Sequence, residues 1–167
     1  DNRFLGYGAE IAAILADEFA REAEFLSIGT NDLVQYSLAV DRTSRELARL
    51  ASYFDPAIIR LIKGVIQAGS FRQRVVSVCG AMASDSLAAI LLVGMGLRNL
   101  SMEASAIPEV KAALARITLE EARDAAATAF DNPARTQLEP SRLPAVYDVV
   151  SGSEVDEVLH GPRTSSC

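Results

Sequence analysis

The sequence predicts an α/β fold built on a parallel sheet, and three observations support this prediction. Short apolar runs that are typical of strands alternate with longer stretches of helical periodicity, as in sheets whose parallel strands are joined by helical crossovers. The strand-like runs are apolar throughout, which is typical of strands that are covered on both faces. The two clearest runs end at a glycine followed by small or polar residues. In parallel α/β folds the functional groups gather at the carboxyl ends of the strands.

The first half of the chain predicts two helices around one strand. Residues 10–22 predict a helix whose apolar face comprises Ile11, Ile14, Leu15 and Phe19. A strand over 25–28 follows and ends in a Gly-Thr-Asn turn. The next predicted helix has Asp55 as its N-cap, a proline in the first helical position and Gly69 as its C-terminal stop.

The second half continues the alternation. Its predicted elements, in chain order, are a strand over 75–79, a helix over 86–95 capped by Ser84 or Asp85, a short strand over 99–102, a helix that opens at Pro108, and a helix after the capping box Thr118–Glu121. The order of helices and strands is therefore that of a βα repeat.

Composition excludes several classes of protein. The 167-residue chain is 50% hydrophobic and 23% charged, with a net charge of −6 and no basic patch, so we expect no nucleic-acid partner. No apolar run reaches the roughly 18 residues that span a bilayer. The two cysteines, Cys79 and Cys167, form neither a disulfide framework nor a closed zinc site, which favours a reducing cytoplasm.

The chain divides into two parts. We expect residues 1–133 to form one α/β domain and residues 134–167, which are rich in proline, to form a loosely ordered tail. The chain opens without Met or a signal segment, and we expect it to be cut from a longer protein.

Polar residues follow the first predicted strand. Asp32 is a plausible ligand for Mg²⁺, which takes one or two protein carboxylates in addition to substrate oxygens. Asn31 and the backbone N–H groups of Gly29 and Thr30 are suited to a phosphate or carboxylate, and Arg42, ten residues after Asp32, is suited to bidentate contact with either. Taken alone, each residue is more simply explained as a turn former, a helix cap or a solvated surface group.

Cys79 ends the second clear strand. Its thiol is placed to exchange a proton with a substrate carbon, but the same residue is also explained as a small buried apolar side chain. His160 lies in the tail without a supporting pattern. The residues alone therefore predict an anion-plus-metal site and do not identify a reaction.

Residues 24–42 resemble the signature of the phosphoenolpyruvate-utilising enzymes, in which an arginine follows ten residues after the aspartate of a Gly-Thr-Asn-Asp-Leu motif. The segments "CG" at 79–80, "LLVGMGLRNLSM" at 91–102 and "IPEVK" at 107–111 resemble the same family, and in particular its enzyme I branch in the bacterial phosphotransferase system. The similarity runs from about residue 12 to residue 133. The matching signature residues are Ser27, Ile28, Gly29, Thr30, Asn31, Asp32, Leu33, Gln35 and Arg42.

The resemblance implies the C-terminal part of a (β/α)₈ barrel, incomplete here with about three strands, that binds phosphoenolpyruvate and Mg²⁺. It also implies phosphoryl transfer to a histidine on a separate domain and then to the phosphocarrier HPr, in a cytoplasmic homodimer. Such an enzyme serves sugar transport or a regulatory nitrogen-type pathway, and the sequence leaves this choice open. Carried over by position, the implied roles are metal ligation by Asp32, substrate contact by Asn31, Arg42, Gly29 and Thr30, and proton donation to carbon by Cys79.

The chain departs from the family pattern in several places. Gly8 stands where the family has a second metal-ligating glutamate, and Glu10 is the nearest substitute. Ala81 replaces a glutamate and Ser84 a glycine, while the earlier strands and the histidine domain are absent from this sequence. We therefore expect the isolated chain to be inactive or to act only when assembled with other chains. Two alternatives stay open: a fragment of a related dikinase or phosphoenolpyruvate synthase, and a non-enzymatic remnant that serves as an interaction module.

Overall fold

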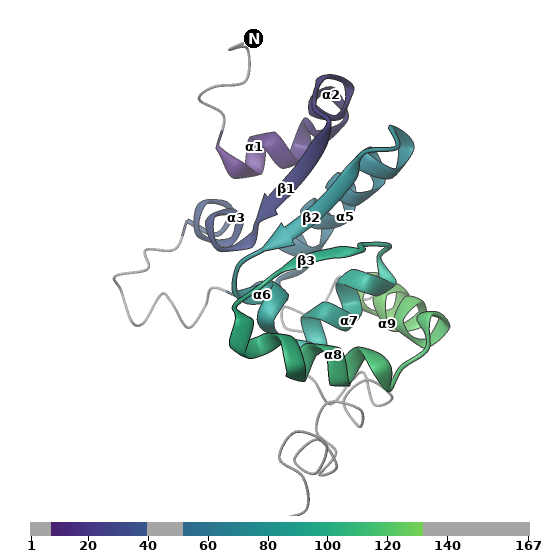
Figure 1. The fold of residues 1–167 in the computed structure, drawn as a ribbon. Helices are drawn as coiled ribbons and strands as arrows, with labels where there is room; N and C mark the ends of the chain where they lie inside the picture. Colours follow the sequence, from purple (N-terminus) through teal and green to yellow (C-terminus); the bar gives the residue numbers. More distant parts are fainter. Residues whose placement is uncertain (1–7, 40–51, 132–167) are drawn as a thin grey trace, which may run out of the picture.

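The computed structural model describes residues 8–39 and 52–131 of the chain. Within these residues the strands β1 (Phe25–Gly29), β2 (Val75–Cys79) and β3 (Asn99–Ser101) form a parallel sheet in the order β1-β2-β3 (Figure 1). The predicted α/β class and parallel sheet are therefore confirmed for the described part of the chain. The predicted tail, 134–167, lies outside the described residues, as does Arg42.

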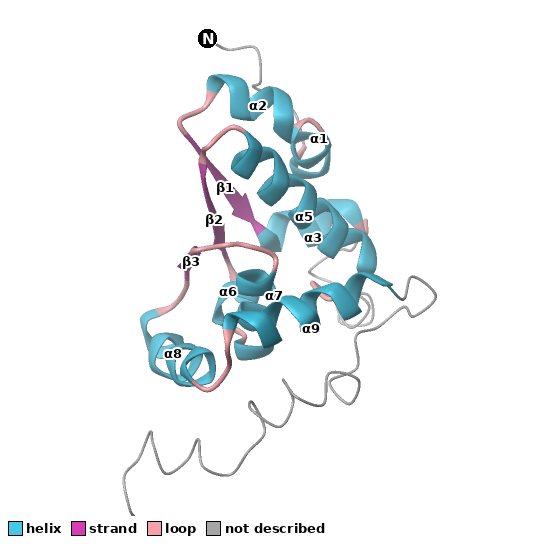
Figure 2. Ribbon diagram, turned by 90° about the vertical axis from the view of Figure 1, so that its right-hand side faces the viewer, coloured by secondary structure: helices cyan, strands magenta, loops and turns pink. Residues whose placement is uncertain are grey.

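One face of the sheet is covered by helices. The side chains on this face are Leu26, Ile28, Val76, Val78 and Leu100, which are buried or half-buried. They pack against α1 (Ala9–Ile14), α2 (Ala16–Glu22) and α5 (Pro56–Phe71), which Figure 2 shows together on one side of β1 and β2.

The opposite face carries small and polar side chains. Because side chains alternate along a strand, Ser27, Ser77 and Cys79 share this face, and Ser27 is exposed while the other two are half-buried. At its amino end Phe25 is 65% and Val75 57% exposed. The expectation that the strands are covered on both faces is wrong for the described residues, since only the alternate positions are buried.

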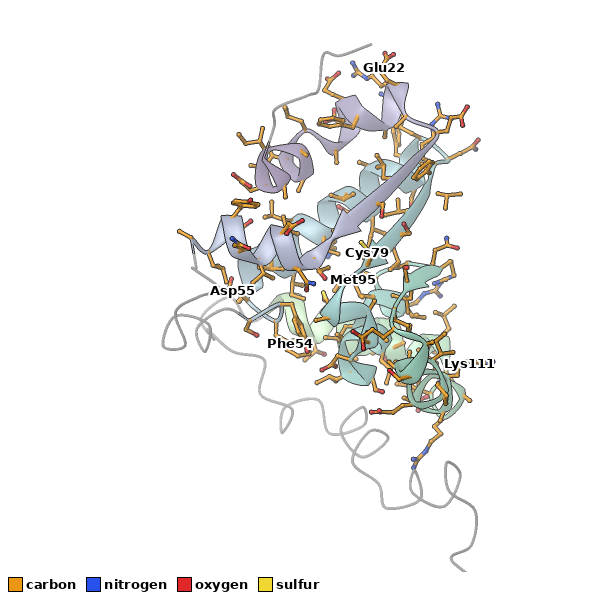
Figure 3. The ribbon with its side chains drawn as sticks, turned by 60° about the vertical axis from the view of Figure 1, so that its left-hand side comes forward. Glu22, Phe54, Asp55, Cys79, Met95 and Lys111 are labelled. Carbon is orange, nitrogen blue, oxygen red and sulfur yellow. The ribbon has the colours of Figure 1, made fainter. Side chains whose placement is uncertain are left out.

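A second apolar cluster joins the helices that follow β2. It comprises buried side chains of α7 (Ser86–Gly94), α8 (Ile107–Ala115) and α9 (Leu119–Asp131). Phe54 and Met95, both labelled in Figure 3, pack against this cluster and against the one under the sheet. The two clusters therefore form a continuous core.

The predicted first helix is interrupted at Leu15, which separates α1 from α2. Its buried positions are Ala16 and Ala20, whereas Ile11 is 42% and Ile14 69% exposed. The predicted apolar face is therefore wrong at these two isoleucines, and the helix segment after the break, α2, packs against α5.

Three predicted caps are confirmed. The Asp55 side chain accepts a hydrogen bond from the Ala57 N–H at 2.8 Å. Asp85 accepts one from the Ala88 N–H at 2.8 Å, which settles the predicted choice between it and Ser84. In the capping box the Thr118 N–H donates to Glu121 at 2.8 Å and the Glu121 N–H donates to Thr118 at 3.2 Å.

Three short helices were missed by the sequence analysis. They are α3 (Thr30–Ser37), α6 (Ala81–Ser84) and the 3₁₀ turn η1 (Ala104–Ala106). Helix α3 begins directly after β1, so Thr30 and Asn31, which were predicted to form a turn, form the first turn of a helix instead. Among the described residues, no helix combines the length and apolar composition that a membrane crossing requires.

Gly69 does not end its helix as predicted, because α5 continues to Phe71. It is buried, and a Cβ at this position would collide with the Val76 side chain of β2. The glycine is therefore explained by the close approach of helix and sheet.

This close approach predicts that alanine substitutions at two glycines of α5 change the free energy of unfolding in opposite directions. Gly69→Ala is expected to lower the free energy of unfolding by about 1–3 kcal/mol, because the methyl group overpacks the core. Gly64→Ala, at an exposed position with no atom within 4 Å of the added Cβ, is expected to raise it by about 0.5–1 kcal/mol through helix propensity. Urea unfolding of both variants measures the difference, and equal effects would contradict the packing described here.

Candidate functional site at the carboxyl edge of the sheet

The register of the strands aligns the predicted site residues. Gly29 of β1 pairs with Cys79 of β2, and Cys79 pairs with Ser101 of β3. This row is the carboxyl edge of the sheet, and α3 and α6 begin beside it. Cys79 lies at the carboxyl end of β2 in Figure 3. The structure thus brings Gly29, Thr30, Asn31 and Asp32 to the same edge as Cys79, which lies about fifty residues later in the sequence.

Contacts between the two strand ends fix their relative position. The Thr30 hydroxyl donates to the Cys79 carbonyl oxygen at 3.0 Å, and Thr30 is only 1% exposed. The Ala81 N–H donates to the Asn31 Oδ1 at 3.2 Å. We call Thr30, Asn31, Cys79, Gly80 and Ala81 the strand-end cluster.

Gly80 is the tightest point of this cluster. Its φ of 114° lies in the region that favours glycine. A Cβ there would lie 2.7 Å from the Thr30 Oγ1 and 3.1 Å from the Asn31 Oδ1. The glycine therefore permits both the backbone turn and the approach of the two side chains.

These contacts define what each residue offers to a ligand. The Thr30 hydroxyl is committed to the Cys79 carbonyl, so only its backbone N–H remains for an anion. The Asn31 side chain is exposed and its oxygen is engaged, which leaves its amide nitrogen as a donor. The N-cap of α3, Gly29, makes no side-chain cap hydrogen bond, and free N–H groups of a first helical turn favour anions.

The Cys79 thiol faces the open side of the sheet. Its sulfur lies 3.6 Å from the Ile28 carbonyl oxygen and 4.0 Å from the Ser27 hydroxyl. The residue is half-buried and is a free cysteine. Sequence reasoning had not assigned Ser27 a role, although the alternation of side chains along β1 would have placed it on the face of Cys79.

Asp32 lies in the first turn of α3 and is exposed. Its Oδ2 would be 3.9 Å from a Cβ at Gly29, so the carboxylate stays close to the end of β1. The positive end of the α3 dipole favours a negative charge at this position. Asp32 is therefore an accessible carboxylate beside the donors described above.

Glu10 lies in the first turn of α1. Its Oε2 atom is buried and has no hydrogen-bond partner. Its carboxylate lies against Gly8, at which a Cβ would be 2.7 Å from the Oε1 and 2.9 Å from the Oε2. Among the described residues, no three His, Cys, Asp or Glu side chains form a group that could hold a metal ion.

A further contact supports the segment after β2. The Tyr53 hydroxyl donates to the Asp85 Oδ2 at 2.8 Å, while the other oxygen of Asp85 caps α7. Burial, and then the hydrogen bond and negative charge of Asp85, raise the pKa of Tyr53 well above its usual range. Sequence reasoning missed this pair, since nothing in the spacing of the two residues indicates contact.

The chain is similar to known proteins over this region. It matches the family model described as "PEP-utilising enzyme, PEP-binding domain" over residues 5–119. A phosphoenolpyruvate-protein phosphotransferase of Latilactobacillus sakei is 43% identical over 133 residues, which is 78% of this chain and 23% of the relative. The protein of the same name from Geobacillus stearothermophilus is 45% identical over 111 residues, 66% of this chain and 19% of the relative. The chain thus spans about a fifth of the length of these curated relatives.

The contacts of the strand-end cluster predict that alanine substitutions at two glycines with positive φ lower the free energy of unfolding by different amounts. Gly96→Ala, where φ is 106° and the nearest atom is 3.9 Å from the added Cβ, is expected to cost only backbone strain, about 1–3 kcal/mol. Gly80→Ala is expected to cost this strain plus about 1–3 kcal/mol of overpacking, and to change the alkylation rate of Cys79. Urea unfolding and mass spectrometry of the alkylated peptide measure both effects. An unchanged Cys79 rate in Gly80→Ala would contradict the role of the cluster in placing the thiol.

The Tyr53–Asp85 pair predicts a dependence of stability on alkaline pH. The pKa of Tyr53 is raised in the folded state. The hydrogen bond from Tyr53 to Asp85 therefore contributes fully to stability below the unfolded tyrosine pKa of about 10, and this contribution is lost as pH rises through the folded pKa. Tyr53→Phe is expected to lose about 1 kcal/mol of stability at pH 8, with a smaller loss above pH about 10. Tyr36→Phe, at a 58% exposed position, is the control. A loss that stays constant with pH would contradict this assignment.

Proposed function

Because the chain belongs to the family of phosphoenolpyruvate-utilising enzymes through its PEP-binding domain, we propose that it is the phosphoenolpyruvate-binding part of an enzyme I-type phosphoenolpyruvate–protein phosphotransferase. The observation on which this proposal rests is the strand-end cluster, which gathers anion donors and a thiol at one edge of the sheet beside the carboxylate of Asp32. Each of these groups has a use in the chemistry of phosphoenolpyruvate.

The substrate carries a phosphate and a carboxylate, so its site requires several donors. We assign phosphate or carboxylate contact to the backbone of Gly29 and Thr30, to the amide nitrogen of Asn31, and to Arg42. The uncapped first turn of α3 supports the first three assignments. Arg42 lies outside the described residues, and its assignment rests on its place in the signature.

Mg²⁺ is the proposed cofactor, with Asp32 as its protein ligand. An exposed carboxylate beside the donors of α3 suits a cation that retains water and takes substrate oxygens. Glu10, whose Oε2 is buried and unpartnered, is the second candidate donor. When bound, Mg²⁺ neutralises charge on the phosphoryl group during transfer.

Cys79 is the proposed catalytic residue. Transfer breaks the bond between the phosphorus and the enol oxygen, the phosphoryl group passes to a histidine of a separate domain, and enolpyruvate remains. The thiol then donates its proton to the terminal carbon and pyruvate forms, while in reverse the thiolate removes that proton. Its position in the row with Gly29, on the open face of the sheet, supports this role.

We propose that the described sheet is part of an eight-stranded barrel. Among the described residues, β1 and β3 pair only with β2, so each has one free edge. A cavity of about 220 Å³ lies along β1, and another of about 490 Å³ along β3. Parallel strands supplied by the rest of a barrel would fill such grooves and cover the face that carries Phe25.

The remaining assignments follow from membership of the enzyme I type. They are phosphoryl delivery to an HPr-type carrier through a histidine domain outside this sequence, a homodimer, service to sugar transport, and a cytoplasmic location. The exposed apolar side chains of α1, Ile11 and Ile14, support association with another chain or domain.

A non-enzymatic remnant is the second candidate, and two positions favour it. Gly8 and Ala81 replace glutamates of the family pattern, which removes two negative charges from the site. In such a remnant the fold and the grooves along the sheet edges persist as an interaction surface without substrate binding.

Calorimetric titration of the full chain with phosphoenolpyruvate and Mg²⁺ separates the two candidates. The proposed function predicts binding heat that requires both components. Asp32→Asn is expected to weaken binding about tenfold or more, because it removes a charged metal ligand.

Asp17→Asn, at an exposed position of α2, is the matched control and is expected to bind like the unaltered chain. Absence of heat in a chain that unfolds cooperatively would overturn the proposed site and favour the remnant.

A further inference from the structure

We infer that Ser27 is a positioning residue for the proposed proton transfer: its hydroxyl holds the Cys79 sulfur and stabilises the thiolate that the transfer leaves behind. This inference rests on the proposed function, since it concerns the thiol that is assigned to proton donation. It goes further by naming a second residue for that step, one that acts through Cys79.

The strand register leaves the Cys79 sulfur beside Ser27. Gly29, the register partner of Cys79 on β1, carries no side chain. The next residue of β1 whose side chain lies on the same face is Ser27, two positions earlier. Its hydroxyl donates to the Cys79 Sγ at 4.0 Å, so the contact reaches diagonally across the two paired strands.

The sulfur makes two hydrogen bonds of opposite sense, both with β1. The thiol donates its proton to the Ile28 carbonyl oxygen at 3.6 Å, and the sulfur accepts from the Ser27 hydroxyl. Only the second bond persists in a thiolate, which has no proton to donate. Among the described residues, the Ser27 hydroxyl is the one hydrogen-bond donor to this sulfur.

Proton donation changes the strength of this contact. When Cys79 protonates enolpyruvate, the S–H bond breaks, the proton forms the new C–H bond of pyruvate, and the electron pair stays on the sulfur. A hydrogen bond to a charged acceptor is shorter and stronger than one to a neutral acceptor, and it favours the charged form. Ser27 is exposed, so its hydroxyl is free to turn towards the sulfur as the charge develops.

The neighbouring elements offer the thiolate no charged partner. The described elements packed most closely against β2 are β1, β3, α5 and α6, and β1, β3 and α6 contain no charged residue. Helix α5 carries Arg60 and Lys63 but covers the opposite face of the sheet. Asp32, in the first turn of α3, adds negative charge to this edge. Within the described part of the chain, the Ser27 hydroxyl is therefore the group that offsets the charge on the sulfur.

Another explanation of position 27 is that it requires only a small side chain, which leaves this face of the sheet open. That role depends on size and not on a hydroxyl. Ser77 provides the comparison, because it lies on the same face two residues before Cys79. Its hydroxyl donates to the Leu26 carbonyl oxygen at 3.5 Å.

The test is the pH dependence of Cys79 alkylation by iodoacetamide in the full chain, since the thiolate is the reacting form. Peptide mass spectrometry distinguishes Cys79 from Cys167. Ser27→Ala is expected to move the midpoint of the pH–rate profile about one pH unit higher, because the thiolate loses its donor. Ser77→Ala is the matched control and is expected to leave the midpoint unchanged.

Two substitutions of similar shape separate the hydroxyl from side-chain size. Ser27→Thr keeps the hydroxyl and is expected to keep the midpoint of the unaltered chain. Ser27→Val lacks the hydroxyl and is expected to shift the midpoint as Ser27→Ala does. Circular dichroism checks that each variant is folded, and the comparison of Thr with Val carries the test if Ser27→Ala does not fold.

Protection of Cys79 from alkylation by phosphoenolpyruvate with Mg²⁺ tests the proposed function separately. If the unaltered chain is protected but Ser27→Ala and Ser27→Val keep its midpoint, the inference is overturned and the proposed function stands. Equal midpoints in the Thr and Val variants, or an equal shift in Ser77→Ala, also overturn the inference. If the unaltered chain shows neither protection nor binding heat, the proposed function is overturned, and with it the role of Ser27 in proton transfer.

Discussion

The parallel pairing of β1 with β2 is the constraint on which the site depends. It sets Gly29 opposite Cys79, so the turns that leave the two strands start side by side. A shift of one residue would move Cys79 to the face covered by helices and separate Thr30 from the Cys79 carbonyl. The alternation of Ile28 and Val78 with the small residues around them fixes this register, since only their face is buried.

Hydrogen bonds within the strand-end cluster hold the carboxyl ends of β1 and β2 together in this register. The hydrogen bond from Thr30 to Cys79 is buried, and the bond from Ala81 to Asn31 crosses between the same two turns. Gly80 permits both because it carries no side chain. Because the Thr30 hydroxyl donates to the Cys79 carbonyl, it is not available as a donor in the proposed site, where the backbone N–H groups of α3 take that role.

Sequence reasoning predicted the features that depend on local chemistry. The capping contacts of Asp55, Asp85 and Thr118 involve neighbours in sequence, and all three were found. The two clear strands were predicted from apolar runs. Local patterns did not predict the break at Leu15 or the exposure of Ile14, because which face of a helix is buried depends on distant packing.

Sequence reasoning predicted only part of the site, because some of its contacts depend on distant packing. The signature identified Asn31 and Asp32, but tertiary packing alone could place Thr30 under Cys79 or the Glu10 carboxylate against Gly8. The contact of Tyr53 with Asp85 spans 32 residues and has no sequence signal. Long-range geometry therefore decides which of the signature residues are available to a ligand.

The central claim is that phosphoenolpyruvate and a divalent ion bind at this edge of the sheet. Amide chemical-shift changes on addition of phosphoenolpyruvate with Mg²⁺ test it most directly. The account predicts that the largest changes fall on the amides of Thr30, Asn31 and Ala81, where the donors and the strand-end cluster lie. Changes confined to α8 and α9, with none at these amides, would contradict it.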